Sequence, residues 1–120
     1  MKKTELGSLI RLQHIRDAIL LALDFVEGYG KDDFLSDPKT QAAVIRQTEI
    51  IGEATYHLPK TLTSLYPHIP WRNIAATRHK IVHEYYEIDL NVIWTIVQIH
   101  LPAFQEQIET IISHLEEGNE

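Results

Sequence analysis

The sequence predicts an all-α protein that folds as a four- to five-helix bundle. Apolar residues recur at steps of three and four through most of the 120 residues, which is the spacing of one face of an α-helix. No segment shows the alternation of apolar and polar residues that is typical of a β-strand, and no internal repeat competes with the helical pattern. A chain of this length has room for one hydrophobic core, so we expect a single domain over residues 1–120.

The first helix is predicted from about residue 6 to residue 26. Its apolar residues form one stripe along the helix, and Gly28 or Gly30 supplies the glycine that commonly follows a helix end. Residues 31–37 carry no clear periodicity, and we expect a loop there.

The second helix is predicted over about residues 38–57. Ser36 and Asp37 precede Pro38, and proline suits the first position of a helix because its fixed φ angle is already helical. Pro59 ends the helix. A short helical turn is expected at residues 62–66.

Two more long helices follow. Pro70 opens a helix from Trp71 to about Tyr86, and Asp89 is placed to cap a last helix that extends to about residue 115. Pro102 either kinks this last helix or restarts it. The last helix has apolar residues on more than one face, which is consistent with packing against a second subunit as well as against its own bundle.

Composition and charge exclude several classes of function. The chain has no cysteine, which excludes disulfides, thiol nucleophiles and thiolate metal sites. It shows no apolar run long enough to span a membrane and no signal-peptide pattern, so we expect a cytoplasmic protein with no membrane partner. The net charge of -6 argues against binding nucleic acid over the whole surface, yet residues 54–83 contain no Asp or Glu and are locally basic.

Reactive side chains gather on the third long helix. His79 and His83 are four residues apart, the spacing at which two imidazoles on one helix can share a metal ion. Lys80 counts against this, because it puts a cation between the two histidines where zinc proteases have a glutamate, and no third ligand is evident. We therefore expect no metal.

A second grouping on the same helix needs no metal. Arg78 can bind a phosphate, His83 can carry a proton near neutral pH, and Tyr85 adds a phenol. On an ideal helix, His83 lies roughly 140° round the axis from Arg78, so one helix alone does not bring them together. Either the backbone is locally distorted, or two copies of the motif face each other across a two-fold dimer; we favour the dimer.

These residues resemble the R-x4-H-x-Y signature of the HEPN superfamily, and the surrounding sequence resembles its HepT toxin branch. Other matching stretches are Gln41, Arg46, residues 49–54, residues 70–72, Ile74-Ala75, residues 81–85 and Asp89-Leu90. The resemblance implies an all-helical bundle of HEPN type that forms a two-fold homodimer. It also implies a metal-independent endoribonuclease without cofactors, acting as a toxin and paired with a minimal nucleotidyltransferase (MNT) antitoxin.

The resemblance also implies roles for individual residues. Arg78 and His83 match the catalytic arginine and histidine, and Tyr85 matches the tyrosine that MNT partners modify with AMP. His79 stands where a small amide or acid is common, so His79 and Lys80 are candidate supporting residues. The implied reaction is attack of an RNA 2′-hydroxyl on the adjacent phosphate. Two alternatives stay open: a non-catalytic partner that binds nucleotide or substrate for the nucleotidyltransferase, and a plain structural bundle.

Overall fold

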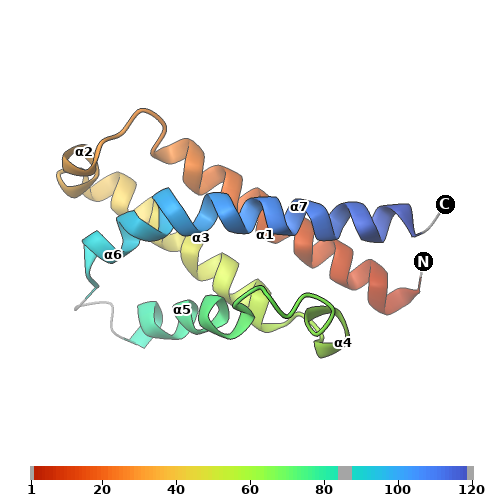
Figure 1. The fold of residues 1–120 in the computed structure, drawn as a ribbon. Helices are drawn as coiled ribbons and strands as arrows, with labels where there is room; N and C mark the ends of the chain where they lie inside the picture. The colour runs from red at the N-terminus through yellow and green to blue at the C-terminus, as the bar shows by residue number, and fades with distance from the viewer. Residues whose placement is uncertain (1, 84–87, 119–120) are drawn as a thin grey trace.

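The computed structural model describes residues 2–83 and 88–118, and within these ranges all side chains except those of residues 79–83. The all-α prediction is confirmed: no strand occurs in the described ranges. Four long helical units pack in the order α7, α1, α3, α5, with α1 between α7 and α3 and with α3 between α1 and α5 (Figure 1). The three long helices that precede the last unit are α1 (Lys3–Phe25), α3 (Pro38–Tyr56) and α5 (Trp71–His83).

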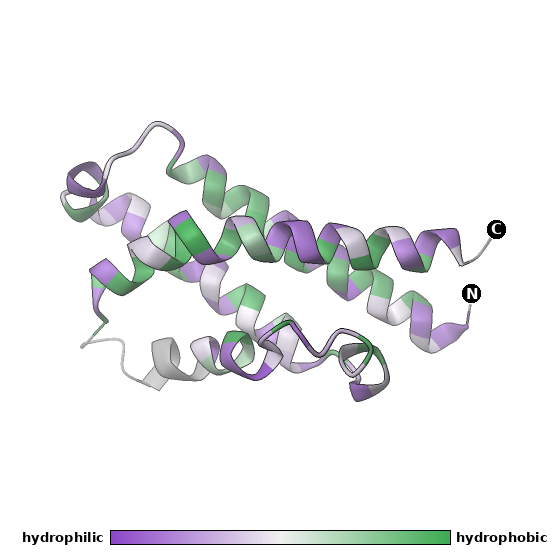
Figure 2. Ribbon diagram, viewed as in Figure 1, coloured by the Kyte–Doolittle hydropathy of each residue, from purple (hydrophilic) through white to green (hydrophobic). Residues whose placement is uncertain are grey.

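The core forms where α1 and α7 meet the other helices. Leu12, Ile15 and Ile19 of α1 are fully buried, as are Ile108 and Ile111 of α7 (Leu101–Glu117). Hydrophobic and hydrophilic residues alternate in bands along both helices, as expected for helices with one buried face (Figure 2). No helix in the described part of the chain is long and apolar enough to cross a lipid bilayer.

The prediction of a loop at residues 31–37 is wrong, because most of this segment forms the short helix α2 (Lys31–Leu35). Asp33 accepts a hydrogen bond from the Gly30 backbone N–H at 2.8 Å, which ties down the start of the helix. Phe34 is fully buried and lies 5.4 Å, centroid to centroid, from the ring of Trp94 in α6 (Leu90–Thr95). This tertiary contact stabilises a helix too short to be stable alone.

The start of α3 agrees with the prediction. Asp37 caps the helix by accepting a hydrogen bond from the Thr40 backbone N–H at 3.1 Å. The other carboxylate oxygen accepts hydrogen bonds from the Tyr29 hydroxyl at 2.6 Å and the Thr40 hydroxyl at 2.7 Å. These hydrogen bonds, with that from Tyr29 contributing most, lower the pKa of Asp37 from 3.8 to about 2.

The low pKa of Asp37 predicts a pH-dependent contribution to stability. A carboxylate whose pKa is depressed in the folded state stabilises the fold above its unfolded pKa, and this contribution is lost as the pH falls. We expect the melting temperature of the natural chain to exceed that of Asp37→Asn by a constant amount above about pH 4, with the difference shrinking towards pH 2. Thermal unfolding of both proteins from pH 2 to 6 measures this, and a difference independent of pH would contradict it.

The remaining boundaries refine the predictions. The short turn expected at residues 62–66 is α4 (Lys60–Thr63), which begins two residues earlier, directly after Pro59. Asp89 caps α6 as expected, accepting from the Asn91 backbone N–H at 2.9 Å. Between α6 and α7 lies a π-helical turn, η2 (Ile96–His100), and the α-helix restarts at Leu101. Pro102 has no N–H to continue the α-helical bonding pattern, which explains the restart.

Candidate functional site

The helix that carries the motif crosses α3 at very close range. A Cβ atom placed on Gly52 of α3 would lie 2.8 Å from the Cβ of Arg78 and 2.9 Å from its backbone nitrogen. Real Cβ atoms do not approach other atoms so closely, so the crossing requires glycine at this position. The start of α5 is fixed separately, because the Trp71 indole N–H donates to the carbonyl oxygens of Thr63 and Tyr66 at 3.1 and 3.0 Å.

Side chains of α3 hold the guanidinium of Arg78. Its Nη1 donates to Oε2 of Glu53 at 2.8 Å, and its Cζ lies 4.0 Å from the centroid of the Tyr56 ring. The Arg78 side chain remains 28% exposed, so solvent and an anionic ligand can reach it. The bond to Glu53 is the one hydrogen bond that this guanidinium makes within the described part of the chain; its Nε is buried without a partner, and the remaining N–H groups on its Nη atoms are the donors left for a phosphate oxygen.

Glu53 is shared between Arg78 and a histidine. Its Oε1 atom lies 2.9 Å from Nε2 of His57, the residue that directly follows α3. The hydrogen bond with His57 lowers the pKa of Glu53, the nearby Arg78 lowers it further, and partial burial opposes both. Glu53 therefore stays ionised near neutral pH and provides a fixed negative partner for the guanidinium.

The other predicted site residues are only partly covered by the description. The structure describes the backbone of His79, Lys80 and His83 as part of α5, but it does not describe their side chains. Tyr85 lies outside the described residues. From Trp71 to His83 the backbone is α-helical throughout. Arg78 and His83 are therefore roughly 140° apart around the helix axis, and the locally distorted backbone considered from the sequence is not observed.

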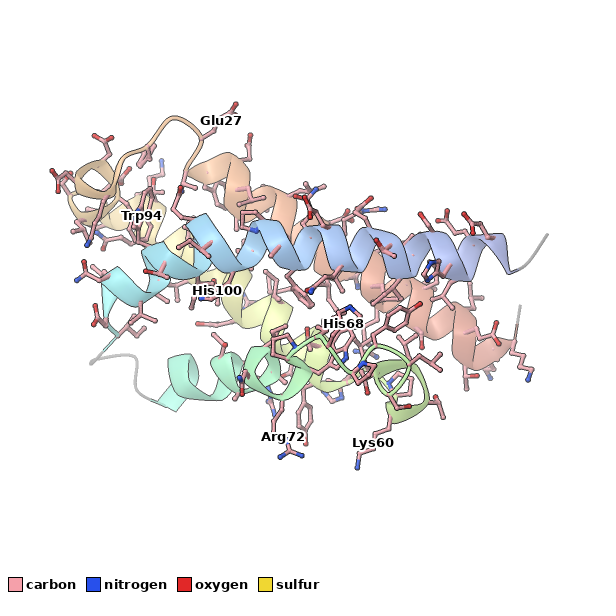
Figure 3. All side chains as sticks on the ribbon, in the orientation of Figure 1. Glu27, Lys60, His68, Arg72, Trp94 and His100 are labelled. Atoms are coloured by element: carbon pink, nitrogen blue, oxygen red, sulfur yellow. The ribbon has the colours of Figure 1, made fainter. Side chains whose placement is uncertain are left out.

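The local surface is cationic on the side of α4 and α5. Lys60 and Arg72 are exposed, and both side chains project from this side away from α7 (Figure 3). The described residues include no group of three or more His, Cys, Asp or Glu side chains placed to hold a metal ion. The described chemistry of the site is thus a partly exposed guanidinium that is paired with Glu53 and flanked by Lys60 and Arg72, and guanidinium is a group suited to binding phosphate.

The spacing of residues in the sequence predicted no role for Glu53, Tyr56 or His57. Glu53 is 25 residues from Arg78 in the chain, so only the packing of α3 against α5 brings them together. One signal was available. Two pairs of residues are spaced by four, Gly52 with Tyr56 and Glu53 with His57. This spacing places the members of each pair next to each other on one helical surface.

The sequence is similar to that of proposed ribonucleases of one family. Residues 15–111 match a family model described as "Ribonuclease HepT-like". The chain is 40% identical over 109 residues to a proposed RNase of Methanocaldococcus jannaschii, covering 91% of this chain and 87% of that protein. It is 41% identical over 100 residues to a proposed ribonuclease HepT of Thermococcus cleftensis, covering 83% and 91%. No solved structure matches significantly.

Proposed function

The chain belongs to the HepT-like ribonuclease family of HEPN type, and on that premise we propose that it is a metal-independent endoribonuclease. The observation that carries the proposal is the guanidinium of Arg78, held by Glu53 and Tyr56 yet still partly exposed, five residues before His83. An arginine in this state is prepared to bind a phosphodiester and to stabilise the charge that develops on it.

The proposed reaction is transesterification within the RNA strand. His83 accepts the proton of a 2′-hydroxyl, whose oxygen then forms a bond to the adjacent phosphorus. The bond from phosphorus to the 5′-oxygen breaks, and that oxygen takes up a proton. The products are a 2′,3′-cyclic phosphate and a free 5′-hydroxyl end. Arg78 stabilises the additional negative charge on the phosphoryl oxygens in the transition state.

We place this reaction at the interface of a two-fold homodimer. The backbone positions of Arg78 and His83 are roughly 140° apart around the axis of a regular helix, so a cleft that uses both residues is most simply formed by one residue from each of two subunits. Val92 and Ile99, on the unit formed by α6, η2 and α7, are exposed apolar residues that support such an association.

The experiment that tests the proposed function is incubation of the purified chain with total RNA in EDTA. Cleavage that persists in EDTA and is lost in His83→Ala supports it. Absence of cleavage, or cleavage that needs added metal ions, would contradict it.

Glu53 is proposed as a positioning residue for Arg78. In Glu53→Gln the side chain keeps its size but loses its charge, so Arg78 is held less firmly while the repulsion between Glu53 and the RNA phosphate disappears. We expect kcat to fall by about tenfold while KM stays equal or decreases. Glu49→Gln is the matched control, because Glu49 pairs with Arg46 one turn earlier on α3. An increase in KM with unchanged kcat would contradict this role.

Regulation is proposed to act through Tyr85. An MNT antitoxin would transfer AMP from ATP, forming a bond between the Tyr85 phenolic oxygen and the α-phosphorus and releasing pyrophosphate. The added phosphodiester would repel RNA from the cationic site and occupy space beside it. We expect Tyr85→Phe to remain toxic in cells that express the antitoxin, whereas Tyr86→Phe is neutralised. Mass spectrometry locates the modification, and AMP on Tyr86 would show that the assignment is wrong by one residue.

A further inference from the structure

A cavity of about 380 Å³ lies beside the candidate site, between α3, α5 and the unit formed by η2 and α7. Its lining residues come from α3, from α5 and the preceding Pro70, and from η2 and α7, and α5 packs mainly against α3 (Figure 1). Phe104, one of the lining residues, makes an edge-to-face contact with Trp71 of α5, and the two ring centroids are 6.0 Å apart. Its volume falls within the range of roughly 300 to 1,000 Å³ that is typical of small-ligand sites in proteins.

The lining of the cavity combines apolar walls with unpartnered polar groups. Ile51 of α3, Ile74 of α5 and Phe104 of α7 supply apolar surface. Asn73 and Gln107 place two amide side chains on opposite walls, and neither amide forms a hydrogen bond with any other described residue. An amide can both donate and accept hydrogen bonds, so the cavity can recognise a flat apolar ligand that carries hydrogen-bond donors and acceptors.

His100 adds a third polar group at the cavity. It ends the π-helical turn η2 and lies on the side of this unit that faces α5 (Figure 3). Like the two amides, its ring forms no hydrogen bond within the described part of the chain. A π-helical turn in a long helix often accompanies a functional site, and here it contributes two residues, Ile96 and His100, to the cavity wall.

The cavity and Arg78 share the same helix crossing. Thr77 lines the cavity and directly precedes Arg78 on α5. Ile51 lines it from α3 and directly precedes Gly52, the residue that contacts Arg78. A phosphate bound at Arg78 would therefore lie at the same helix crossing as the cavity, although Arg78, Glu53 and Tyr56 are not part of the cavity lining.

We propose that this cavity is a nucleobase subsite that determines which base the enzyme accepts beside the cleaved bond. The inference rests on the proposed ribonuclease function. Single-stranded RNA is recognised mainly through unstacked bases that pack on side chains and form hydrogen bonds at their edges. A purine or pyrimidine fits the observed combination, because its flat ring can pack on the apolar walls while its edge forms hydrogen bonds with the amides and the imidazole.

The test uses two measurements on the full chain. The first is the base preference around the cleaved bond in a randomised RNA. The second is binding of AMP, GMP, CMP and UMP by calorimetry, which does not depend on cleavage. Two altered proteins address the cavity: the double variant Asn73→Ala/Gln107→Ala removes both amides, and Ala103→Phe fills the space from an exposed wall position. Matched controls are Gln105→Ala and Ala42→Phe, at helical positions that do not line the cavity.

We expect the natural chain to bind one nucleotide better than the others. The double variant should lose this discrimination by roughly tenfold, Ala103→Phe should weaken binding, and both controls should behave as the natural chain does. Equal binding of all four nucleotides, or base preferences that the variants leave unchanged, would overturn the inference even if RNA is cleaved. A shift of Ala103→Phe from dimer to monomer in light scattering would also overturn it, since the cavity would then be covered by a second copy. If the natural chain fails to cleave RNA, the proposed function fails, and the calorimetry still decides whether the cavity binds a base.

Discussion

Replacing either Arg78 or His83 with alanine should abolish RNA cleavage while leaving the fold intact. A positioned acid or base contributes roughly 10² to 10⁴ in rate, and a donor that stabilises transition-state charge contributes about 10² to 10³. We therefore expect each variant to lose about 10³ in kcat. Arg78 is partly exposed and its ion pair lies at the surface, so circular dichroism and melting temperature should change little.

One control makes this prediction specific. His79→Ala removes a neighbouring histidine from the same helix and should reduce activity far less than His83→Ala. An equal loss would favour the paired-histidine site considered from the sequence.

Mixing the two inactive variants tests the proposed dimer. In a heterodimer of Arg78→Ala and His83→Ala subunits, one of the two clefts regains both residues if each cleft draws on both subunits. About a quarter of the natural activity should return in an equal mixture. No recovery from a mixture shown to contain heterodimers would place both residues of each site in one subunit.

Gly52→Ala should destabilise the protein and reduce its activity. In an open helix, replacing glycine with alanine stabilises by up to about 1 kcal/mol. At Gly52 the added Cβ would meet Arg78 at 2.8 Å from its Cβ and 2.9 Å from its backbone nitrogen, so α3 and α5 must separate. Overpacking of this kind costs about 1 to 3 kcal/mol, and displacement of Arg78 by even 1 Å could lower the rate about 10²-fold.

Gly7→Ala is the matched control for this effect. Gly7 lies in α1, is exposed, and a Cβ there would meet nothing within 4 Å. We expect Gly7→Ala to raise the free energy of unfolding slightly and to leave activity unchanged. Chemical denaturation of both variants measures the contrast, and a Gly52→Ala protein as stable and active as Gly7→Ala would show that the close crossing is not required.

Local signals predicted the long helices well. Asp37 with Pro38, and Asp89 before α6, mark helix starts through bonds that span only two or three residues, so the sequence nearby contains all that is needed. The helix α2 was missed because Phe34 is held by Trp94, which lies far away in the sequence. The π-helical turn before Pro102 was likewise not foreseen, although the sequence did indicate an interruption there.

The candidate site was predictable only in part. Arg78 was identified from the spacing of reactive residues and from the family resemblance, and the structure describes its surroundings. Glu53 and Tyr56, which hold it, could not be assigned from spacing along α5, because they come from another helix. Close approach at Gly52 is a property of two helices together, and no local pattern in either one specifies it.

The most direct test of the proposed chemistry uses one RNA with a single altered sugar. After the cleavage position has been mapped, an RNA with 2′-deoxyribose at that nucleotide is compared with the all-ribose RNA, both incubated with the chain in EDTA. We expect the all-ribose RNA to give a 2′,3′-cyclic phosphate and a 5′-hydroxyl end, and the altered bond to remain intact. Cleavage of the altered bond, or products with a 3′-hydroxyl and a 5′-phosphate, would contradict attack by the 2′-hydroxyl.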